Sequence, residues 1–292
     1  MTSHSVATPA DASSDSQIEW LRIAPWLVMQ VSCLLVFAVG WSPVAVLVAV
    51  ALYLIRMFAV TAFYHRYFSH RSYKLSRAMQ LFAAVLGATA VQRGPLWWAA
   101  HHRHHHRSSD GESDPHSPHT HSLWWSHVGW FTTKQAWQTD LSKVPDFAKY
   151  PELVWLDQHD RVVPAILLVA LAVFGGVLGN QYPHLETSAL QMVVWGFCIS
   201  TTALFHVTAS VNSVAHLFGR RVWPTSDHSR NSFLLALLTL GEGWHNNHHW
   251  HPSSVRQGFR WWQVDITFYV LRAMSLVGLV SGIRPLPSRV RP

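Results

Sequence analysis

Long stretches without a charged residue constrain this chain more than any other feature of its sequence. Asp, Glu, Lys and Arg are missing from three such stretches, 24–55, 162–185 and 187–218. A helix needs about 20 apolar residues to cross the hydrocarbon core of a bilayer, and turn-forming residues interrupt the pattern at 40–43 and 180–183. The stretches therefore predict four membrane-spanning helices in two hairpins, at about 24–63 and 163–210. Packed helices inside a large soluble protein are the alternative, but only 13% of the residues are charged, against about 25% in soluble domains.

The distribution of positive charge predicts which side of the membrane each segment occupies. All 22 Lys and Arg residues lie outside the hairpin turns at 40–43 and 180–187. Cytoplasmic loops carry the excess of Lys and Arg in membrane proteins. Both termini and the segments 64–162 and 212–292 are therefore predicted to be cytoplasmic, in a multi-pass protein of the cytoplasmic membrane. The basic residues form no recognisable nucleic-acid motif, so no nucleic-acid partner is expected.

The rest of the chain is predicted to complete a single integral-membrane domain over 23–292. Residues 1–22 are predicted to be a disordered cytosolic tail, because most of this segment is polar and rich in Ser and Ala. Three further apolar stretches are too short or too polar to cross a bilayer. They are predicted to lie as interfacial helices against the cytoplasmic face: 78–92, 233–240 and 263–283.

Histidine is strongly clustered on the predicted cytoplasmic side. The chain has 21 histidines, and eleven of them fall in HRYFSH (65–70), HHRHHH (101–106), NSVAH (212–216) and HNNHH (245–249). On a helix, residues at i, i+3 and i+4 share one face and can aim three rings at one small volume. Two triplets have this spacing: His102, His105 and His106, and His245, His248 and His249. His65 and His70 are about 140° apart on an ideal helix, so either the helix ends between them or they serve two different metals.

Nine imidazoles can thus converge near the membrane surface: His65, His70, His102, His105, His106, His216, His245, His248 and His249. Nine are too many for one ion and suit two adjacent ions with four or five ligands each, with Asn212 as a weaker tenth ligand through a bound water. A low-specificity histidine tract would explain 101–106 alone, but not separated clusters beside predicted helix ends. The sequence therefore predicts an all-α membrane protein of four transmembrane helices whose helical cytosolic cap carries a histidine-rich dimetal site.

The same residues resemble those of the membrane fatty acid desaturases, specifically the bacterial branch of the stearoyl-CoA (acyl-CoA Δ9) desaturase family. HRYFSH is similar to the HxxxxH box of that family, HRHHH to its HxxHH box, GEGWHNNHH to its third box, and NSVAHLFG to the segment that supplies the ninth histidine and the asparagine. The register of the second box stays open, because His101, His104 and His105 also read HxxHH. The match at Arg103 and at 109–110 favours 102, 105 and 106.

This resemblance implies a reaction and its cofactors. It implies two iron ions (Fe2+/Fe3+) that use O2 and two electrons to insert a cis double bond, of Δ9 type, into a long-chain acyl-CoA or a chain on another acyl carrier, next to membrane lipid. An unactivated methylene has no acidic proton, so acid–base groups alone could not do this, whereas imidazole is a suitable iron ligand. The chain has no CxxC pair and no Gly-rich nucleotide loop. The electrons are therefore expected from an external donor of ferredoxin, rubredoxin or cytochrome b5 type with its reductase.

An acyl chain needs a tunnel that places the reacting carbons at the metals. Trp98, one turn before His102, is either a wall of this tunnel or an ordinary interfacial tryptophan. Met57 and Tyr53 precede His65 by 8 and 12 residues, which puts Tyr53 about 18 Å away along one helix. The family places its chain-length stop at this end of the same helix. Tyr53 and Met57 are therefore predicted to limit acyl length.

Charged residues near the boxes have two candidate roles. Metal-bound histidine usually donates its second N–H to a carboxylate or carbonyl, which suggests Asp110, Asp114 and Glu242 as partners of the ligands. The tunnel mouth should be basic, because acyl carriers are anionic. Four residues are candidates there, unless they only reflect membrane topology: Arg66, Arg71, Lys74 and Arg93.

Two rival functions are weighed against desaturation. A membrane hydroxylase or alkane monooxygenase would use the same scaffold, and would add one oxygen where a desaturase removes two hydrogens. A metal-ion transporter would need ionisable ligands within the spans, where His206 is essentially alone. The full set of boxes favours desaturation.

Overall fold

The computed structural model describes residues 17–287, and within them the chain is helical, with isolated bridges but no strand. Four helices in this part are long and apolar enough to cross a membrane: Trp20–Val39, Pro43–Ser69, Val162–Gln181 and Ala189–Leu217. The all-helical fold with four candidate spans is thus confirmed. The arrangement of these helices in a bilayer, as two hairpins with cytoplasmic termini, stays a prediction.

The N-terminal boundary differs from the predicted one. Residues 1–16 of the predicted tail lie outside the described residues, but the first helix begins at Trp20, inside the segment expected to be disordered. The segment before it is anchored, because Glu19 N–H donates to Thr132 O at 2.9 Å and Lys134 N–H donates to Gln17 O at 3.0 Å. Backbone pairing with a distant loop therefore orders the end of the tail.

Three of the spans consist of several consecutive helical segments. The first comprises α2 (Trp20–Ser32), η1 (Cys33–Leu35) and α3 (Val36–Val39), and the second α4 (Pro43–Phe58) and the π-helical η2 (Ala59–Ser69). The third is α9 (Val162–Gln181) alone, and η7 (Pro183–Leu185) follows it. The fourth comprises α10 (Ala189–Met192), the π-helical η8 (Val193–Ile199), α11 (Ser200–Asn212) and α12 (Val214–Leu217).

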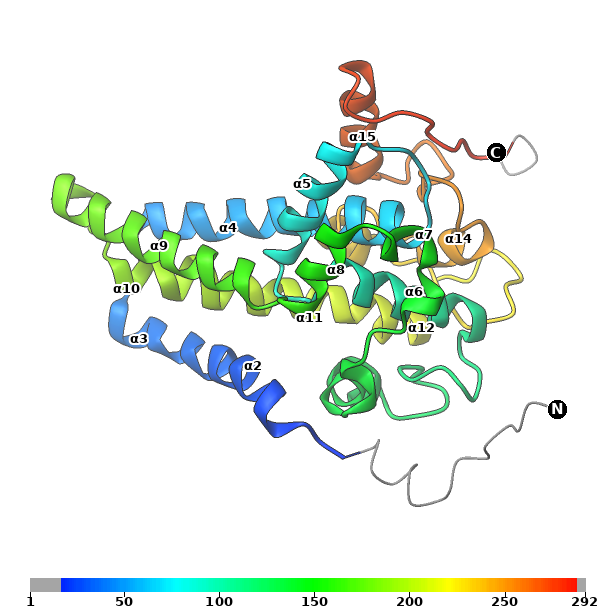
Figure 1. Cartoon of the computed structure of the whole chain (residues 1–292), viewed down its shortest axis with the longest axis horizontal. Helices are drawn as coiled ribbons and strands as arrows, with labels where there is room; N and C mark the ends of the chain where they lie inside the picture. Colours follow the sequence, from blue (N-terminus) through cyan, green and yellow to red (C-terminus); the bar gives the residue numbers. More distant parts are fainter. Residues whose placement is uncertain (1–16, 288–292) are drawn as a thin grey trace.

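The other helices form a cap at one end of the spans. They are α5 (Arg77–Ala88), α6 (Pro95–Ser108), η3 (Trp125–Gly129), η4 (Trp130–Thr132), η5 (Gln135–Trp137), η6 (Leu141–Lys143), α7 (Pro145–Ala148), α8 (Pro151–Gln158), α13 (Phe233–Leu238), α14 (His245–Trp250) and α15 (Ile266–Leu276). The spans extend to one side of the molecule, whereas α6, α12 and α14 gather at the opposite end (Figure 1). The short helices expected at 78–92, 233–240 and 263–283 are present as α5, α13 and α15, and their contact with a membrane stays a prediction.

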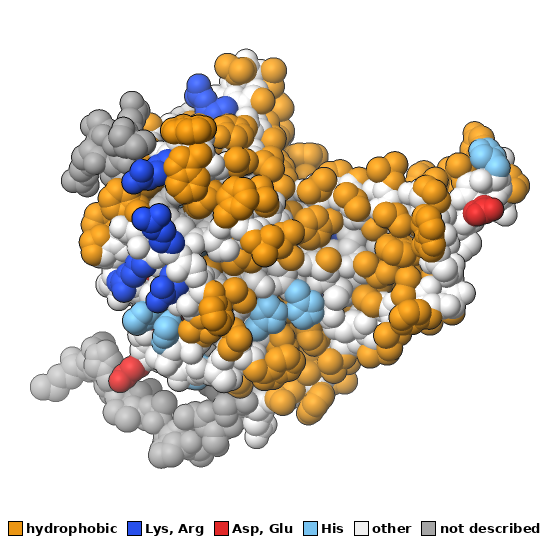
Figure 2. All heavy atoms as spheres, turned by 180° about the vertical axis from the view of Figure 1, so that it is seen from behind, with side chains coloured by type: hydrophobic (Ala, Val, Ile, Leu, Met, Phe, Trp, Pro, Cys, Tyr) orange, Lys and Arg blue, Asp and Glu red, His pale blue; other side chains and the backbone are white. Residues whose placement is uncertain are grey.

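The spans turn apolar side chains outward. Phe37, Leu47 and Ile166 are each more than 60% exposed, and Figure 2 shows hydrophobic side chains over most of the elongated part of the molecule. Such a surface is unfavourable in water and is what the hydrocarbon of a bilayer accommodates. The exposure pattern agrees with a membrane protein.

The second span contains a charged side chain, Arg56, so the expectation that His206 is essentially the only ionisable group of the spans is wrong. Arg56 is fully buried. Its five N–H groups donate to the backbone oxygens of Leu52, Thr89 and Gly196 and to the hydroxyls of Ser200 and Thr201. Because these groups satisfy all guanidinium donors, Arg56 ties the second span to the fourth and to the loop after α5.

Candidate metal centre

Four segments deliver the nine predicted histidines to one region of the cap. His65 lies in η2 with His70 directly after it, α6 carries His102, His105 and His106, α12 carries His216, and α14 carries His245, His248 and His249. The close approach of α14 depends on two glycines that precede it. Gly241 has a φ of +136°, which favours glycine, and a Cβ on Gly243 would collide with the backbone nitrogen of Ala236.

The nine rings form two groups, in each of which one nitrogen per ring lies within 4.8 Å of the others. The first group is His65, His70, His102, His106 and His248, and the second is His105, His216, His245 and His249. The groups adjoin, since the ring centroids of His106 and His249 are 4.4 Å apart. The convergence expected from the sequence is present, as five rings beside four.

Neither histidine triplet aims at one volume, and on this point the sequence-based expectation was wrong. In α6, the rings of His102 and His106 belong to the first group, and the ring of His105 belongs to the second. In α14, the rings of His245 and His249 belong to the second group, and the ring of His248 belongs to the first. Successive helical residues are 100° apart, so the i+4 ring lies 40° from the first and the i+3 ring lies 60° away on the other side. Because of this angular difference, each of the two helices contributes rings to both groups, as two ions side by side would require.

On an ideal α-helix the rings of His65 and His70 would point in different directions, but in this structure they point to the same group. The segment is a π-helix in which His70 N–H donates to His65 O at 3.2 Å. In a π-helix, residues five apart are joined by hydrogen bonds and lie one above the other. Both rings therefore face the first group, with their Nε2 atoms 3.1 Å apart. Of the two expected alternatives, the structure shows the first, because η2 ends at Ser69, between His65 and His70. Two different metals are not needed, since both rings belong to one group.

The spacing of the ring nitrogens fits metal ions. In the first group the Nε2 atoms of His70 and His102 are 2.8 Å apart, those of His106 and His248 2.9 Å, and those of His65 and His248 3.0 Å. Imidazole nitrogens bind a divalent ion such as zinc at about 2.1 Å, so two ligands at right angles lie about 3.0 Å apart. In the second group, Nε2 of His216 and His245 are 3.0 Å apart.

Buried carboxylates orient four of the rings through Nδ1. The pairs are His65 with Glu242 at 2.5 Å, His216 with Asp110 at 2.8 Å, His105 with Asp114 at 3.0 Å and His249 with Asp227 at 2.7 Å. A carboxylate on Nδ1–H leaves the Nε2 lone pair free for a metal. The Nε2 atoms of His105 and His249 are indeed buried without a hydrogen-bond partner among the described residues. The donor set therefore fits two metal ions.

Asp110, Asp114 and Glu242, which the sequence suggested as partners of the ligand histidines, each contact one of the nine rings. Asp227 was not among the suggested partners. Asp227 also accepts from the backbone N–H of Ser229 at 2.9 Å, so a tight turn presents it to His249. Its sequence signal, an acid in SDHS between the fourth histidine segment and the third box, is weak without the fold.

Burial and neighbouring charges shift the pKa values of five of the rings and of Glu242. Burial, followed by neighbouring histidines, lowers the pKa of His70, His102, His106, His245 and His248 well below the usual 6.5. For Glu242, burial acts to raise the pKa, but the charges of His65 and Arg66 outweigh it and bring the pKa to about 2. Neutral imidazoles and ionised carboxylates are the protonation states that metal binding requires.

The two extra histidines of the second box lie apart from both histidine groups. His101 Nε2 lies 3.3 Å from Gln138 O, and His104 Nε2 lies 2.9 Å from Ser113 O. Neither belongs to either group. The positions that face the groups are therefore 102, 105 and 106.

A third cluster of possible metal ligands, which the sequence did not suggest, lies beside the second group and consists of His105, Asp114 and His116. His116 Nδ1 lies 3.2 Å from Asp114, the carboxylate that also holds His105. Its ring meets Trp130 edge to face at 5.0 Å. The DPH motif carries both residues, and only the fold shows that Asp114 links a ring in the second group to a ring in a cavity wall.

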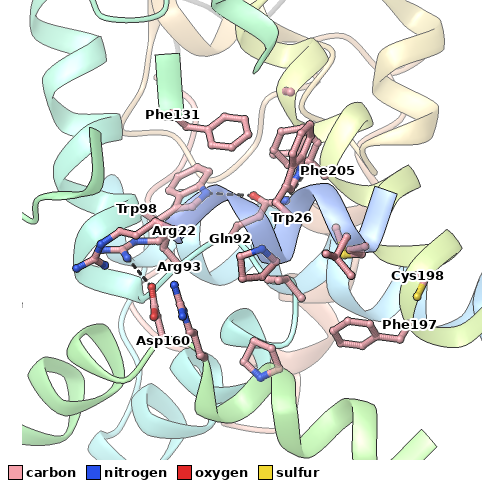
Figure 3. Close-up of a pocket in the computed structure, with 18 of the residues that line it drawn as sticks. Arg22, Trp26, Gln92, Arg93, Trp98, Phe131, Asp160, Phe197, Cys198 and Phe205 are labelled. Carbon is pink, nitrogen blue, oxygen red and sulfur yellow. Dashed lines mark hydrogen bonds and ion pairs between the residues drawn. The ribbon is translucent and has the colours of Figure 1, made fainter. Parts of the chain in front are cut away.

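A cavity of about 540 Å³ leads to the histidines. Aromatic side chains of the first span, the 125–132 segment and the fourth span line it, including Trp26, Phe131 and Phe205 (Figure 3). A second cavity, of about 40 Å³, touches His65, His102 and His245. Four residues line both cavities: Trp98, His102, Thr208 and Asn212.

The predicted tunnel residues fall on different parts of this space. Trp98 stacks on His102 with ring centroids 5.0 Å apart and lines both cavities. Met57 lines the small cavity. Tyr53 lines neither, and its hydroxyl donates to Leu238 O at 2.8 Å; it packs near Met57 in one apolar cluster.

Of the four basic residues suggested for the mouth, Arg93 alone lines the large cavity. It pairs with Asp160 at 2.7 Å and lies over the Trp137 ring at 4.8 Å. Arg66 is fully buried instead, between Glu242 and Asp265 at 3.0 Å each. Two residues that the sequence did not suggest for the mouth, Arg22 and Arg161, also line this cavity.

Comparison with known proteins agrees with this site. The sequence model of the family described as Fatty acid desaturase matches residues 40–278. The chain is 36% identical to the palmitoyl-monogalactosyldiacylglycerol delta-7 desaturase of Arabidopsis thaliana, over 89% of this chain and 67% of that protein. It is 36% identical to the acyl-CoA 5-desaturase AL21 of Anemone leveillei (87% and 75%) and 32% identical to the sn-1 stearoyl-lipid 9-desaturase of Anabaena variabilis (93% and 96%). With its boxes assembled around two histidine groups, the chain belongs to the fatty acid desaturase family.

Proposed function

We propose that this protein is a membrane diiron fatty acyl desaturase. It inserts a cis double bond at Δ9 into a long-chain saturated acyl chain, carried as an acyl-CoA thioester or on another anionic carrier. The observation that carries the proposal is the pair of adjacent histidine groups beside a 540 Å³ cavity with apolar walls, which His102 of the first group lines. Relatives named delta-9 acyl-lipid desaturase and stearoyl-lipid 9-desaturase support the bond position.

Iron bound by the two groups supplies the oxidant that an unactivated C–H bond needs, because acid and base groups alone cannot break it. The reaction balances as –CH2–CH2– + O2 + 2 electrons + 2 H+ → –CH=CH– + 2 H2O. The equation consumes O2 and two electrons. The proposed partners are therefore O2 and an external one-electron carrier.

The residues of the chain hold the centre and position the substrate. Asn212 lines the small cavity together with His245, and we assign it as a ligand through water that completes the four-histidine group. Trp98 is held by its indole N–H, which donates to Gln92 Oε1 at 3.3 Å, while Gln92 donates to Thr208 at 3.1 Å. These hydrogen bonds hold Trp98 in place where it lines both cavities. A fixed wall at this point can position two adjacent carbons of the acyl chain at the metals.

The decisive experiment is to express the chain with a ferredoxin or cytochrome b5 reductase system and to analyse cellular fatty acids. We expect products lighter by two hydrogens, with the double bond at carbon 9. Products heavier by one oxygen would identify a hydroxylase instead. Metal uptake into vesicles without any lipid product would favour a transporter.

Acyl length should depend on Met57. The Met57→Ala substitution enlarges the small cavity beside the histidines and removes the stop proposed for the methyl end of the chain. One methylene in an apolar pocket is worth about 1–3 kcal/mol, so we expect the ratio of longer to shorter accepted chains to rise about 10-fold or more. Competition assays with acyl chains of graded length measure this ratio.

The control for this prediction is Met274→Ala. Met274 is partly buried, whereas Met57 is 1% exposed, and Met274 packs on the main core. It lines neither cavity. It should leave the chain-length preference unchanged. If Met57→Ala also leaves the longest accepted chain unchanged, Met57 is not the stop.

A further inference from the structure

Helix α14 connects the histidine groups to the protein surface. It carries His248 of the first group and His249 of the second, and it ends at Trp250. The Trp250 side chain is 40% exposed. Its ring stacks on Trp223 with centroids 5.5 Å apart and an interplanar angle of 7°. An aromatic pair thus lies at the surface one residue beyond a ring of the candidate centre.

Two buried asparagines fix this aromatic pair to α14. Asn246 Oδ1 accepts from the backbone N–H groups of Val222 and Trp223, both at 2.7 Å. Asn247 Oδ1 accepts from the indole N–H of Trp223 at 3.0 Å. Both asparagines are at most 1% exposed and lie between His245 and His248. The loop that carries Trp223 is therefore rigidly attached to the helix that carries the rings.

The chain around this pair exposes positive charge only. Residues 213–292 contain nine Arg, no Lys and three acids. The acids are buried and face inward: Asp227 contacts His249, Glu242 contacts His65 and Arg66, and Asp265 contacts Arg66. No carboxylate side chain of this segment is therefore exposed among the described residues.

Three exposed arginines flank the aromatic pair. Arg220 and Arg221 precede Trp223 in the same loop, and Arg260 follows Phe259, whose ring centroid is 6.1 Å from that of Trp223. We call the surface of Trp223, Trp250, Arg220, Arg221 and Arg260 the α14 face. Exposed aromatic and arginine side chains are the types enriched at protein interfaces.

The position of the α14 face argues against contact with lipid head groups. α14 lies at the end of the molecule opposite the spans (Figure 1). Seen from behind, Lys and Arg side chains gather at that end and not over the elongated apolar part (Figure 2). Positive charge that serves topology is needed within reach of the membrane. An acidic protein in the aqueous phase is the partner that this placement fits.

We propose that the α14 face is the docking site of an acidic one-electron carrier protein, of iron–sulfur or haem type. This inference rests on the proposed function, because a desaturase needs two electrons per double bond. The carrier binds twice per turnover and is oxidised by one electron each time; the two electrons and two protons join O2 and the two substrate hydrogens to give two waters. Trp250 and Trp223 bring the carrier's redox group close to His249. Electrostatic steering suits such brief contacts, because it raises association rates without tight binding.

The test combines charge reversal with two independent readouts. The wild-type protein and the double variant Arg221→Glu/Arg260→Glu are placed in phosphatidylcholine nanodiscs. Binding and reoxidation are measured with three acidic carriers, a [2Fe–2S] ferredoxin, a rubredoxin and the soluble domain of cytochrome b5, and with basic cytochrome c. Arg272→Glu, an exposed position on α15, is the matched control. Single turnover after reduction with dithionite reports on the centre without any carrier.

We expect the double variant to lose carrier affinity and reoxidation rate about 10-fold or more at low salt, and to lose most of the salt dependence. Its iron content and its dithionite turnover should equal those of the wild type. Trp250→Leu should slow carrier reoxidation, whereas Trp155→Leu should not; Trp155 is 48% exposed and stacks on His159, which belongs to neither group.

Three outcomes would overturn the inference. The first is unchanged binding of the acidic carriers to the double variant, and the second is turnover supported by the basic carrier alone. The third is a double variant that loses affinity for anionic vesicles but keeps its carriers, which would make the face a lipid contact. If iron-loaded wild-type protein makes no product with dithionite, the proposed function is contradicted. The binding measurements with the double variant would still show whether carriers dock on the α14 face.

Discussion

The His248→Ala variant is expected to lose desaturation and to lose the metal of the first histidine group. Nε2 of His248 lies 3.0 Å from that of His65 and 2.9 Å from that of His106, so this ring contacts two others of the same group. Loss of an outer partner of a metal ligand costs about 10–100-fold in affinity or activity, and loss of the ligand itself should leave less than about 1% of the wild-type rate. Iron content, measured by mass spectrometry on purified protein, should fall from two ions per chain toward one.

His104→Ala is the matched control for this prediction. His104 lies in the histidine-rich run of α6, which contributes rings to both groups as α14 does, but its own ring contacts Ser113 O and belongs to neither group. It should retain both irons and most of the activity. Equal losses in the two variants would mean that the histidine-rich segments bind metal without a defined geometry, and the two-group description would be wrong.

Asp227→Ala is expected to weaken metal binding by the second group about 10–100-fold. Asp227 accepts the Nδ1–H of His249 at 2.7 Å, and it stays ionised because the hydrogen bond and charge of His249 outweigh the effect of burial and lower its pKa. Without the carboxylate, His249 can rotate or change tautomer, and its Nε2 lone pair is no longer directed at the metal. Retention of iron during dialysis against a graded chelator measures the effect.

Two control variants test whether the effect comes from the carboxylate of Asp227 itself and not from the loss of any acidic residue. They are Asp227→Asn and Asp140→Ala. Asparagine keeps an acceptor for His249 but removes the charge, so Asp227→Asn should lie between the wild type and Asp227→Ala. Asp140 is exposed and contacts Ser142 and Lys143, so its loss should not alter iron retention. If Asp227→Ala retains iron like the wild type but melts at lower temperature, Asp227 only supports its turn.

The spans were predictable because hydropathy is a local property. A run such as 162–185 without charge has one favourable environment whatever surrounds it, and the helix found there, Val162–Gln181, begins within one residue of the expected 163. The helical spacing within each box was equally readable. Arg56 shows the limit of this reasoning, because its buried position depends on hydroxyls and carbonyls contributed by Thr89 and Thr201, far away in the chain.

The site was predictable in membership but not in arrangement. Its nine histidines could be named, and so could Asp110, Asp114 and Glu242. The π-helix that aligns His65 with His70 could not be predicted, because it replaces the usual helical hydrogen bonds in a segment whose residues do not demand it. Asp227 and the cavity walls depend on loops whose positions are set by packing.

By itself, the sequence determined that four apolar helices occur and that a large set of imidazoles lies at their ends, since residue type and short-range spacing decide both. Only the tertiary structure decided how the imidazoles are shared. Each triplet spans about 100° of its helix, so the direction in which α6 and α14 approach one another assigns the ring at i+3 to one group and the pair at i and i+4 to the other. That direction follows from contacts between distant segments, such as the close packing of Gly243 against α13, which spacing along the chain cannot specify.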